Sequence, residues 1–329
     1  MTVIYKEDDG DLEVLRGRTI GIIGYGNLGR PIALNLRDSG MRVQVAVRTD
    51  EAQELAQIDG LIPSPIEQLV REIDILLMLL PDEVMAKVYL EKVSPHLRRG
   101  HILIFASAYN VAFGYIEPPP FVDVGLIAPR TIGHAVRDRY KTGRGFYSFI
   151  AAGQDASGNL WAVLLAVAKA MGSLRAGAVE ITMEQEAELD LFIQQAILPT
   201  LHHMMVTAAH LLTERGYPPE AVMMDLYISG EFTDYLASAG EAGMLHALSQ
   251  ASLTGQFGIL SRMERFKDMK LERLMEVTLR EIRQGKFATE WAQEYAEGYP
   301  RLQKLLKIQK DMDLWELEQQ TIDYLRGYD

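Results

Sequence analysis

The sequence predicts two domains, an α/β domain over residues 1–180 and an all-α domain over residues 181–329. Three observations predict this organisation. Short apolar runs alternate with helical segments through the first half, a glycine-rich turn follows one of these runs, and long segments with helical spacing fill the second half. At 329 residues the chain is also long enough for two domains that each bury a hydrophobic core.

The glycine-rich turn predicts a dinucleotide site. An apolar run over residues 19–23 leads into Gly24-x-Gly26-x-x-Gly29, and residues 31–36 continue as the first turns of a helix. Gly24 allows a tight turn, Gly26 lets a pyrophosphate approach the backbone, and Gly29 lets the helix pack against the strand. The helix N-terminus offers unpaired N–H groups and a favourable dipole to the phosphates. This context favours a nucleotide site of the Rossmann type over an ordinary structural turn.

Further apolar runs extend the predicted sheet along the chain. They cover residues 43–47, 73–80, 102–105, 122–127 and 146–152. Continuous apolar strands between helices are typical of a parallel sheet that is buried on both faces. Strand-like runs disappear beyond about Gly177, where the chain becomes helical. The main helical segments there are residues 184–198, 201–214, 219–227, 274–284 and 302–325.

The composition excludes several classes of protein. A formal net charge of −12 argues against a nucleic-acid partner, since the phosphates would be repelled. The chain has no cysteine, which excludes disulfides, thiol catalysis and thiolate metal sites. Residues 1–10 are polar and acidic, unlike a signal peptide, and no apolar run reaches membrane-spanning length. We therefore expect a cytoplasmic protein with no membrane and no nucleic-acid partner.

Several motifs resemble those of one known family. They are GYGNLG at 24–29 with ALNLRDSG at 33–40, LLPDEV at 79–84, IAP at 127–129 with GHxVR at 133–137, QDASG at 154–158, RAG at 175–177 and ELDLF at 188–192. Together they resemble ketol-acid reductoisomerase, an enzyme of branched-chain amino-acid biosynthesis. The resemblance is strong to about residue 195 and can be traced beyond it. It implies the short form of the family, with a Rossmann domain and a helical domain, knotted and paired as a homodimer.

The fingerprint and the resemblance together assign the cofactor-binding residues. These are Gly24, Tyr25, Gly26, Asn27, Leu28, Gly29, Arg48, Thr49, Leu80, Pro81, Asp82 and Ser107. The residues at the end of the second strand determine cofactor preference. A carboxylate there binds the ribose 2′-hydroxyl and favours NAD, whereas a basic residue binds the 2′-phosphate and favours NADP. Arg48 and Thr49 come first there, which favours NADP(H), while Asp50 leaves NAD(H) possible.

The positions that correspond to metal ligands depart from the family pattern. The family implies two magnesium ions, held by an Asp and a Glu at i, i+4 on one helix and by two Glu residues of the partner subunit. Here the first pair reads Asp190 and Gln194, and ungapped reading from the Pro219-Glu220 dipeptide places the second at Asp225 and Ser229. Two of four carboxylates are replaced, which predicts at most one weak cation site. We therefore expect no metal site for the migration step and no magnesium requirement.

Other departures lie near the expected nicotinamide. The family segment AHGFN reads Ala-Ser-Ala-Tyr-Asn at residues 106–110, and Arg130 replaces an active-site lysine of the family, whereas a family serine is kept at Ser252. The candidate catalytic residues are Asp190, Gln194, Asp225, Ser252, Ser107 and Arg130. Asp190 could act as a general acid, and Arg130 could bind a substrate carboxylate through two hydrogen bonds. Alternatively, these two side chains only form a salt bridge.

These departures predict an NAD(P)H-dependent oxidoreductase that reduces a C=N (imine) or C=O bond of a small molecule. The reaction would need neither magnesium nor isomerisation, because hydride transfer requires only orientation, a proton source and stabilisation of charge. Two alternatives remain open. The chain could be a genuine ketol-acid reductoisomerase that holds its metal through Asp190, Asp225 and other ligands, or a non-catalytic cofactor-binding protein.

Overall fold

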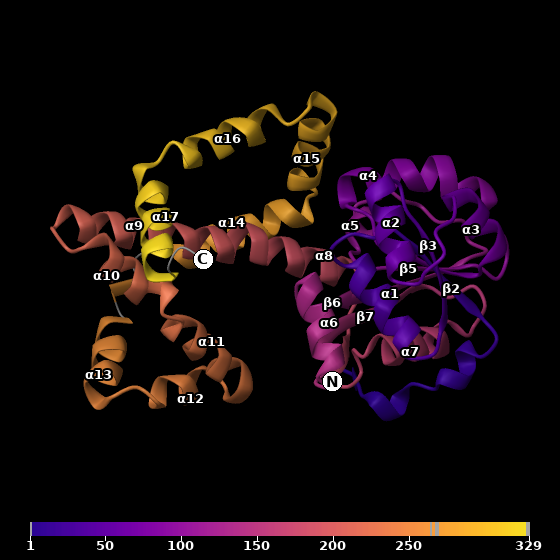
Figure 1. Ribbon diagram of the computed structural model, residues 1–329, viewed down its shortest axis with the longest axis horizontal. Coiled ribbons are helices and arrows are strands. Elements are labelled where there is room, and N and C mark those ends of the chain that lie inside the picture. The colour runs from indigo at the N-terminus through magenta and orange to yellow at the C-terminus, as the bar shows by residue number, and fades with distance from the viewer. Residues whose placement is uncertain (1, 264, 267–269, 327–329) are drawn as a thin grey trace. The chain divides into compact units, whose positions relative to one another are not determined.

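The computed structural model describes residues 2–263, 265–266 and 270–326. The chain divides into two compact units, Met1–Leu189 and Asp190–Asp329. Figure 1 shows that the first unit contains a sheet with helices on both faces, whereas the second is built from helices. The boundary expected after residue 180 falls at the end of the last strand of the first unit.

An eight-stranded sheet in the described residues forms the centre of the first unit, in the order β1-β8-β7-β6-β5-β4-β2-β3. Its strands are β1 (Ile4–Tyr5), β2 (Thr19–Ile23), β3 (Arg42–Ala46), β4 (Ile75–Met78), β5 (Ile102–Phe105), β6 (Asp123–Pro129), β7 (Tyr147–Gln154) and β8 (Gly177–Glu180). Neighbours from β3 to β6 are parallel, as are β7 and β8.

Two features of the sheet correct the sequence-based expectation. β7 runs antiparallel to β6, and β1 runs antiparallel to β8, so the sheet is mixed rather than parallel. The apolar pattern missed this because it reports burial on both faces and not strand direction. A strand also forms at Gly177–Glu180, where strand-like runs were expected to have ended. It was missed because its residues, Gly-Ala-Val-Glu, include only one large apolar side chain and so form no apolar run.

Helices of the first unit cover both faces of the sheet. They are α1 (Gly29–Asp38), α2 (Asp50–Ile58), α3 (Ile66–Glu72), α4 (Asp82–Val88), α5 (Tyr109–Ala112), α6 (Gly133–Lys141), α7 (Leu160–Met171) and α8 (Met183–Phe192), whose last residues enter the second unit. Along β2 the side chains alternate between the faces. Ile20 and Ile22 join a core with α1 and α7, while Ile23 joins a core with α3 and α4.

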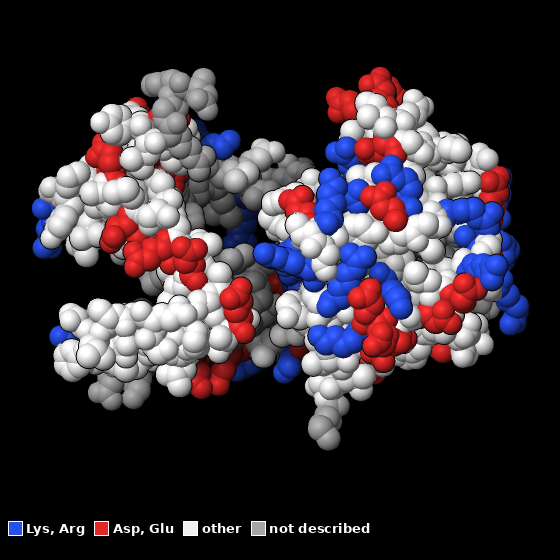
Figure 2. All heavy atoms as spheres, turned by 60° about the horizontal axis from the view of Figure 1, so that its bottom comes forward, with Lys and Arg blue, Asp and Glu red and all other residues white. Residues whose placement is uncertain are grey.

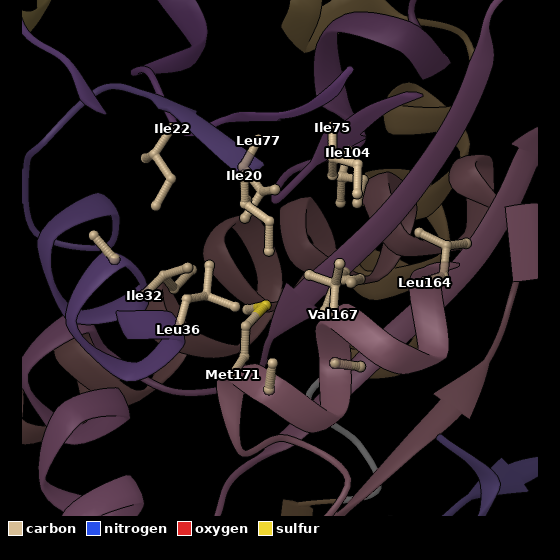
Figure 3. Close-up of a cluster of buried hydrophobic side chains, with 14 of the residues drawn as sticks. Ile20, Ile22, Ile32, Leu36, Ile75, Leu77, Ile104, Leu164, Val167 and Met171 are labelled. Carbon is tan, nitrogen blue, oxygen red and sulfur yellow. The ribbon is translucent and has the colours of Figure 1, made fainter. Parts of the chain in front are cut away.

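The core on the α1 side fixes the helix that follows the glycine-rich turn. Figure 3 shows Ile32 and Leu36 of α1 packed among side chains of β2, β4, β5 and α7, and both are fully buried. Burying one such side chain contributes about 1.5–3 kcal/mol relative to leaving it exposed. Ile32 and Leu36, at positions i and i+4 of α1, therefore anchor this helix against one face of the sheet.

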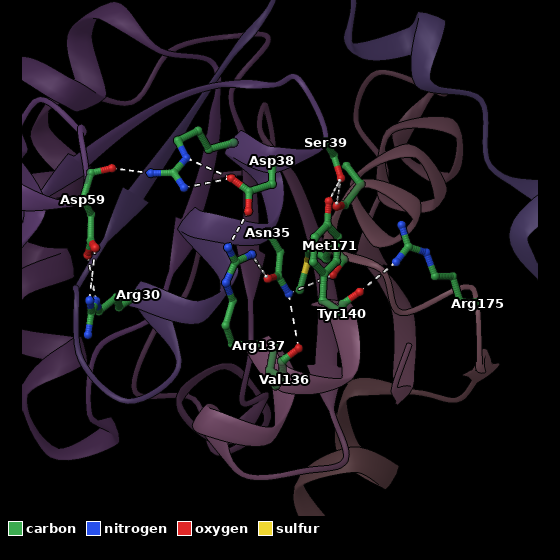
Figure 4. A network of polar contacts seen from close by, with 12 residues as sticks. Arg30, Asn35, Asp38, Ser39, Asp59, Val136, Arg137, Tyr140, Met171 and Arg175 are labelled. Atoms are coloured by element: carbon green, nitrogen blue, oxygen red, sulfur yellow. Dashed lines mark hydrogen bonds and ion pairs between the residues drawn. The ribbon is translucent and has the colours of Figure 1, made fainter. Parts of the chain in front are cut away.

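Polar contacts also anchor α1. The side chain of Asn35 is fully buried, and its Nδ2 donates to the carbonyl oxygens of Met171, at 3.1 Å, and Val136 (Figure 4). Arg137 donates to Asn35 Oδ1 at 2.8 Å and forms an ion pair with Asp38. Because each buried polar atom of Asn35 has a partner, its burial does not leave an unmet hydrogen bond. These bonds join α1 to α6 and α7.

The second unit consists of helices in the described residues. These are α9 (Leu198–Glu214), α10 (Pro219–Met223), α11 (Glu231–Ala242), α12 (Met244–Ser249), α13 (Leu253–Arg262), α14 (Leu271–Arg283), α15 (Lys286–Glu297), α16 (Pro300–Lys310) and α17 (Asp313–Arg326). The expected single helix over 302–325 is two helices. α16 ends at Lys310, and the acidic Asp313 begins α17, where a carboxylate suits the helix dipole.

None of the helices in the described part of the chain has the length and apolar character needed to cross a membrane.

Candidate functional site

A cavity of about 1090 Å³ lies at the carboxyl ends of the parallel strands of the first unit. Its lining includes residues that follow β2, β3, β4 and β5, at 24–28, 47–49, 79–85 and 106–107. The chain passes from β2 to β3 on one side and then to β4 on the other side of β2, so the strand order reverses here. Open α/β sheets bind ligands at such a reversal. The cavity is therefore the candidate active site.

The glycine-rich turn has the geometry that a dinucleotide requires. Gly24 has a φ of 107°, and a Cβ there would lie 2.3 Å from the carbonyl oxygen of Leu79. A Cβ on Gly29 would lie 2.1 Å from the carbonyl oxygen of Gly24, so the helix can approach the turn only without a side chain. Gly26 lines the cavity, and a Cβ on it would meet no atom within 4 Å. That open space beside the backbone fits a pyrophosphate.

The cavity brings together the residues expected to bind the cofactor, except Gly29. The others that line it are Gly24, Tyr25, Gly26, Asn27, Leu28, Arg48, Thr49, Leu80, Pro81, Asp82 and Ser107. Gly29 lies at the start of α1 and packs beneath the turn. The glycine-rich fingerprint and the strand ends are local signals. The sequence alone could therefore predict that these residues lie at one site.

Tyr25 and Arg30 attach the turn to the end of α2. The Tyr25 hydroxyl and Arg30 Nε both donate to Asp59 Oδ2 at 2.7 Å, and the ion pair of Arg30 with Asp59 is drawn in Figure 4. Burial, followed by the hydrogen bond to the Asp59 carboxylate, raises the pKa of Tyr25, so its hydroxyl remains a donor. The hydrogen bond with Arg30 in turn lowers the pKa of Asp59. These contacts hold the turn in one conformation.

Two residues at the end of β3 have different roles. The Thr49 hydroxyl accepts a hydrogen bond from the backbone N–H of Ala52 and caps α2. Arg48 is exposed and makes no ion pair among the residues that the structure describes. Its guanidinium is therefore available to an anionic group of a bound cofactor.

A buried carboxylate that sequence reasoning missed lies at the ends of β5 and β6. Glu186, on α8, is 1% exposed. Its Oε2 accepts from the backbone N–H of Ala108 at 2.9 Å, and its Oε1 accepts from Arg130 at 3.2 Å. The Arg130 guanidinium also lies 5.0 Å from the centre of the Phe149 ring. The four-residue spacing from Asp190 on the same helix is the signal that could have identified Glu186.

Ser107 follows β5 and lines the cavity. Its Oγ accepts a hydrogen bond from the backbone N–H of Tyr109 at 3.1 Å. This bond fixes the Ser107 side chain beside Ala108, the next residue, whose backbone N–H donates to Glu186. Ser107 and Arg130 are thus both held by contacts within the first unit.

Four of the expected catalytic residues belong to the second unit. Gln194 Nε2 donates to Asp190 Oδ2 at 2.7 Å. Asp225 is exposed on a π-helical segment, Met224–Ile228, that ends beside Ser229. Ser252 is the N-cap of α13, where its Oγ accepts from the backbone N–H of Gly255. This contact gives Ser252 a structural role that sequence reasoning did not assign.

The side chains of Asp190 and Gln194 carry oxygen atoms, the donor type that magnesium requires. Mg²⁺ takes oxygen ligands, keeps several waters and commonly uses one or two protein carboxylates. The Asp190 carboxylate offers oxygen donors of this kind, whereas the Gln194 amide, one turn later on the helical path, presents its nitrogen to Asp190 and would offer its oxygen only after rotation. No group of three or more His, Asp or Glu side chains suited to a metal occurs within the described residues.

Two family models match the chain. "Acetohydroxy acid isomeroreductase, NADPH-binding domain" matches residues 14–177, and "Ketol-acid reductoisomerase, C-terminal domain" matches residues 183–325. The chain is 38% identical to the ketol-acid reductoisomerase (NADP(+)) of Pyrobaculum aerophilum, over 93% of this chain and 94% of that protein. It is 39% identical to the ketol-acid reductoisomerase (NAD(P)(+)) of Metallosphaera sedula, over 97% and 94%.

A solved structure is similar over nearly the whole chain. It is an NADH-preferring ketol-acid reductoisomerase from an uncultured archean, with a TM-score of 0.90 and 30% identity. The similarity covers 97% of this chain and 98% of that one. The Rossmann unit followed by a helical unit is thus the architecture that the sequence predicted.

The same comparisons contradict the expectation of an imine or carbonyl reductase without isomerase activity. Relatives named as ketol-acid reductoisomerases match both units at 38% and 39% identity. The expectation depended on the loss of carboxylates at Gln194 and Ser229. It was wrong because Mg²⁺ can be held by one or two carboxylates with water, so these two changes do not argue for another reaction. The chain belongs to the ketol-acid reductoisomerase family and is an NAD(P)H-dependent oxidoreductase.

Proposed function

We propose that this protein is a ketol-acid reductoisomerase, which migrates an alkyl group of a 2-acetohydroxy acid such as acetolactate and reduces the resulting 2-keto acid. The observation that carries this proposal is that similarity to such enzymes extends through both units, over more than nine tenths of the chain. The cavity at the strand ends supports it, because its glycine-rich turn leaves room for a dinucleotide.

In this function the first unit binds and orients the cofactor. The pyrophosphate lies at Gly26, and the nicotinamide half extends toward Ser107 at the end of β5. Arg130 binds the substrate carboxylate. Its guanidinium lies against the Phe149 ring and forms an ion pair with Glu186, and these contacts orient it for two hydrogen bonds to a carboxylate. Hydride transfer then depends on this orientation.

We also propose that the reaction uses Mg²⁺, held by Asp190 with the amide oxygen of Gln194. When bound, the ion supplies Lewis-acid stabilisation of negative charge on the substrate oxygens. For Gln194 to offer its oxygen, its amide must turn, since its nitrogen donates to Asp190 in the structure. The carboxylate of Asp190 also orients the Gln194 side chain.

The test is oxidation of NADPH by the purified protein with acetolactate, once with Mg²⁺ and once with EDTA. We expect turnover with Mg²⁺, loss of turnover with EDTA, and recovery when excess Mg²⁺ is added back. Turnover that is unchanged by EDTA would contradict the role of the ion. Binding of NADPH without turnover of acetolactate under any of these conditions would contradict the proposed activity itself.

We propose a preference for NADP(H), with Arg48 binding the 2′-phosphate. The named relatives include NADP(+)-dependent, NAD(P)(+)-dependent and NADH-preferring enzymes, so the preference must come from this chain's own residues. Arg48→Gln should raise the KM for NADPH about tenfold, because a hydrogen bond to a charged group contributes about 1.5–3 kcal/mol. The KM for NADH should stay within about twofold, since NADH lacks the phosphate that Arg48 contacts. Equal changes for both cofactors would place Arg48 elsewhere on the dinucleotide.

We propose that two copies of the chain form a homodimer through the helical unit. Its side chains Leu245, Leu253 and Phe257 are 78%, 82% and 70% exposed, and Figure 2 shows wide uncharged stretches on this unit. Exposed apolar patches of this kind mark interaction surfaces. Light scattering should give about twice the 36.9 kDa of one chain. A mass of one chain at micromolar concentration would contradict the proposal.

Cytoplasmic location and the lack of nucleic-acid partners stay predictions.

A further inference from the structure

An ion pair forms part of the cavity wall and has no role in the function described above. Glu67, in the first turn of α3, lies 3.3 Å from Nζ of Lys92. Lys92 belongs to a π-helical segment, Tyr89–Val93, that continues α4. Both residues line the cavity, and their side chains are 35% and 45% exposed, so a bound molecule can reach them.

The segment before Glu67 places the pair at one end of the cavity. The backbone N–H of Ser64 donates to the carbonyl oxygen of Val45 at 2.9 Å, and Pro63 forms a bridge with the same residue of β3. Pro63 and Ser64 therefore lie along the free edge of β3, the last strand of the sheet, and lead directly into α3, whose first turn contains Glu67. Ser107 follows β5, and β2 and β4 lie between these two ends.

The glycine-rich turn divides the cavity between these two ends. This turn follows β2, which lies between β4 and β3 in the sheet. A dinucleotide whose pyrophosphate lies at Gly26 therefore extends one half toward β5 and the other half toward β3. Under the proposed function the nicotinamide occupies the β5 end. The adenosine half then occupies the β3 end, where Arg48, Glu67 and Lys92 line the wall.

The two side chains offer opposite hydrogen-bonding functions next to each other. A backbone hydrogen bond is the main reason that the pKa of Glu67 lies below its usual value. The Lys92 ammonium also lowers this pKa, to a smaller extent, while burial acts in the opposite direction. At neutral pH Glu67 is therefore a carboxylate, which only accepts, while the Lys92 ammonium only donates. Adenine presents the complementary pattern, an amino donor beside a ring-nitrogen acceptor.

We propose that Glu67 and Lys92 recognise the adenine base of the cofactor, Glu67 accepting from the 6-amino group and Lys92 donating to ring nitrogen N7, an acceptor that hypoxanthine also has. This inference rests on the cofactor orientation of the proposed function. Hypoxanthine has a carbonyl oxygen in place of the amino group, so it would face the Glu67 carboxylate with an acceptor. The site therefore selects adenine dinucleotides over hypoxanthine dinucleotides.

The experiment compares the Kd values of NADPH and of its hypoxanthine analogue, measured by titration of the reduced nicotinamide's fluorescence. The full-length protein should bind NADPH about five- to tenfold more tightly than the hypoxanthine analogue. This ratio is smaller than a fully buried bidentate contact to a base would give, because the ion pair is partly exposed. Glu67→Gln should bring the ratio close to one, because an amide can donate to the hypoxanthine oxygen. Lys92→Gln should weaken binding of both cofactors.

A matched control is Asp74→Asn, which removes the carboxylate of another partly exposed ion pair, with Arg98, outside the cavity. This variant should keep the ratio of the unmodified protein. Equal Kd values for the two cofactors, or an unchanged ratio in a folded Glu67→Gln protein, would overturn the inference. Selective binding of NADPH without turnover of acetolactate would support it while contradicting the proposed activity. Failure to bind NADPH at all would overturn both.

Discussion

Alanine at Gly26 should weaken NADPH binding by about ten- to a hundredfold without altering the fold. A Cβ at this position meets no atom of the protein within 4 Å, so the backbone can keep its conformation. The same methyl group projects where the cavity borders the turn, and there it would occupy the space of the pyrophosphate. Steric overpacking costs about 1–3 kcal/mol, and each 1.4 kcal/mol is about tenfold in Kd.

Gly29→Ala is the matched comparison, because its Cβ would lie 2.1 Å from the carbonyl oxygen of Gly24. This contact cannot form without displacement of backbone, so we expect a loss of stability of about 3 kcal/mol as well as weaker cofactor binding. Thermal melting and NADPH fluorescence titration on both variants separate the two effects. Normal NADPH affinity in Gly26→Ala would show that the pyrophosphate does not approach this turn.

Removing the carboxylate of Glu186 should be the most damaging single change at the substrate end of the site. Glu186→Ala removes the acceptor of the Ala108 N–H and one partner of the Arg130 guanidinium. Breaking a buried ion pair costs about 3–5 kcal/mol, and the lower end applies here because Arg130 is 28% exposed. Loss of these contacts would also shift Arg130 and the segment after Ser107 from their positions, so we expect kcat to fall about a hundredfold.

Urea unfolding and steady-state kinetics measure these effects. Glu186→Gln should lose less stability than Glu186→Ala, because its amide oxygen can still accept from Ala108. The control is Glu184→Gln, an exposed position on the same helix, which should change stability by less than about 0.5 kcal/mol. Unchanged kcat in Glu186→Ala would mean that the pair supports the fold alone and does not position catalytic groups.

Much of the first unit could be predicted because its signals are local. The apolar runs at 19–23 and 102–105 coincide with β2 and β5, since strands buried on both faces contain few polar residues. β1 was not predicted, because it has two residues and forms only by pairing with β8. The direction of β7 depends on the path of the chain through α6, which no pattern within the strand reports.

The site shows the same difference between local and distant signals. The glycine-rich turn could be recognised within six residues of sequence. Gly133 could not be recognised as its support, although a Cβ on Gly133 would lie 1.7 Å from the carbonyl oxygen of Asn27. Likewise Glu186 acquires its role only through Ala108 and Arg130, which come from the ends of different strands. Contacts between residues far apart in the chain require the folded structure.

The exposed apolar side chains of the helical unit, among them Leu253 and Phe257, have a thermodynamic consequence. In the proposed homodimer, part of the apolar surface that stabilises each chain is buried only on association, so mass action couples folding to subunit concentration. The midpoint of thermal unfolding would then rise as the protein is concentrated. A polar substitution on this surface would lower that midpoint in dilute solution without disturbing any contact within a single chain.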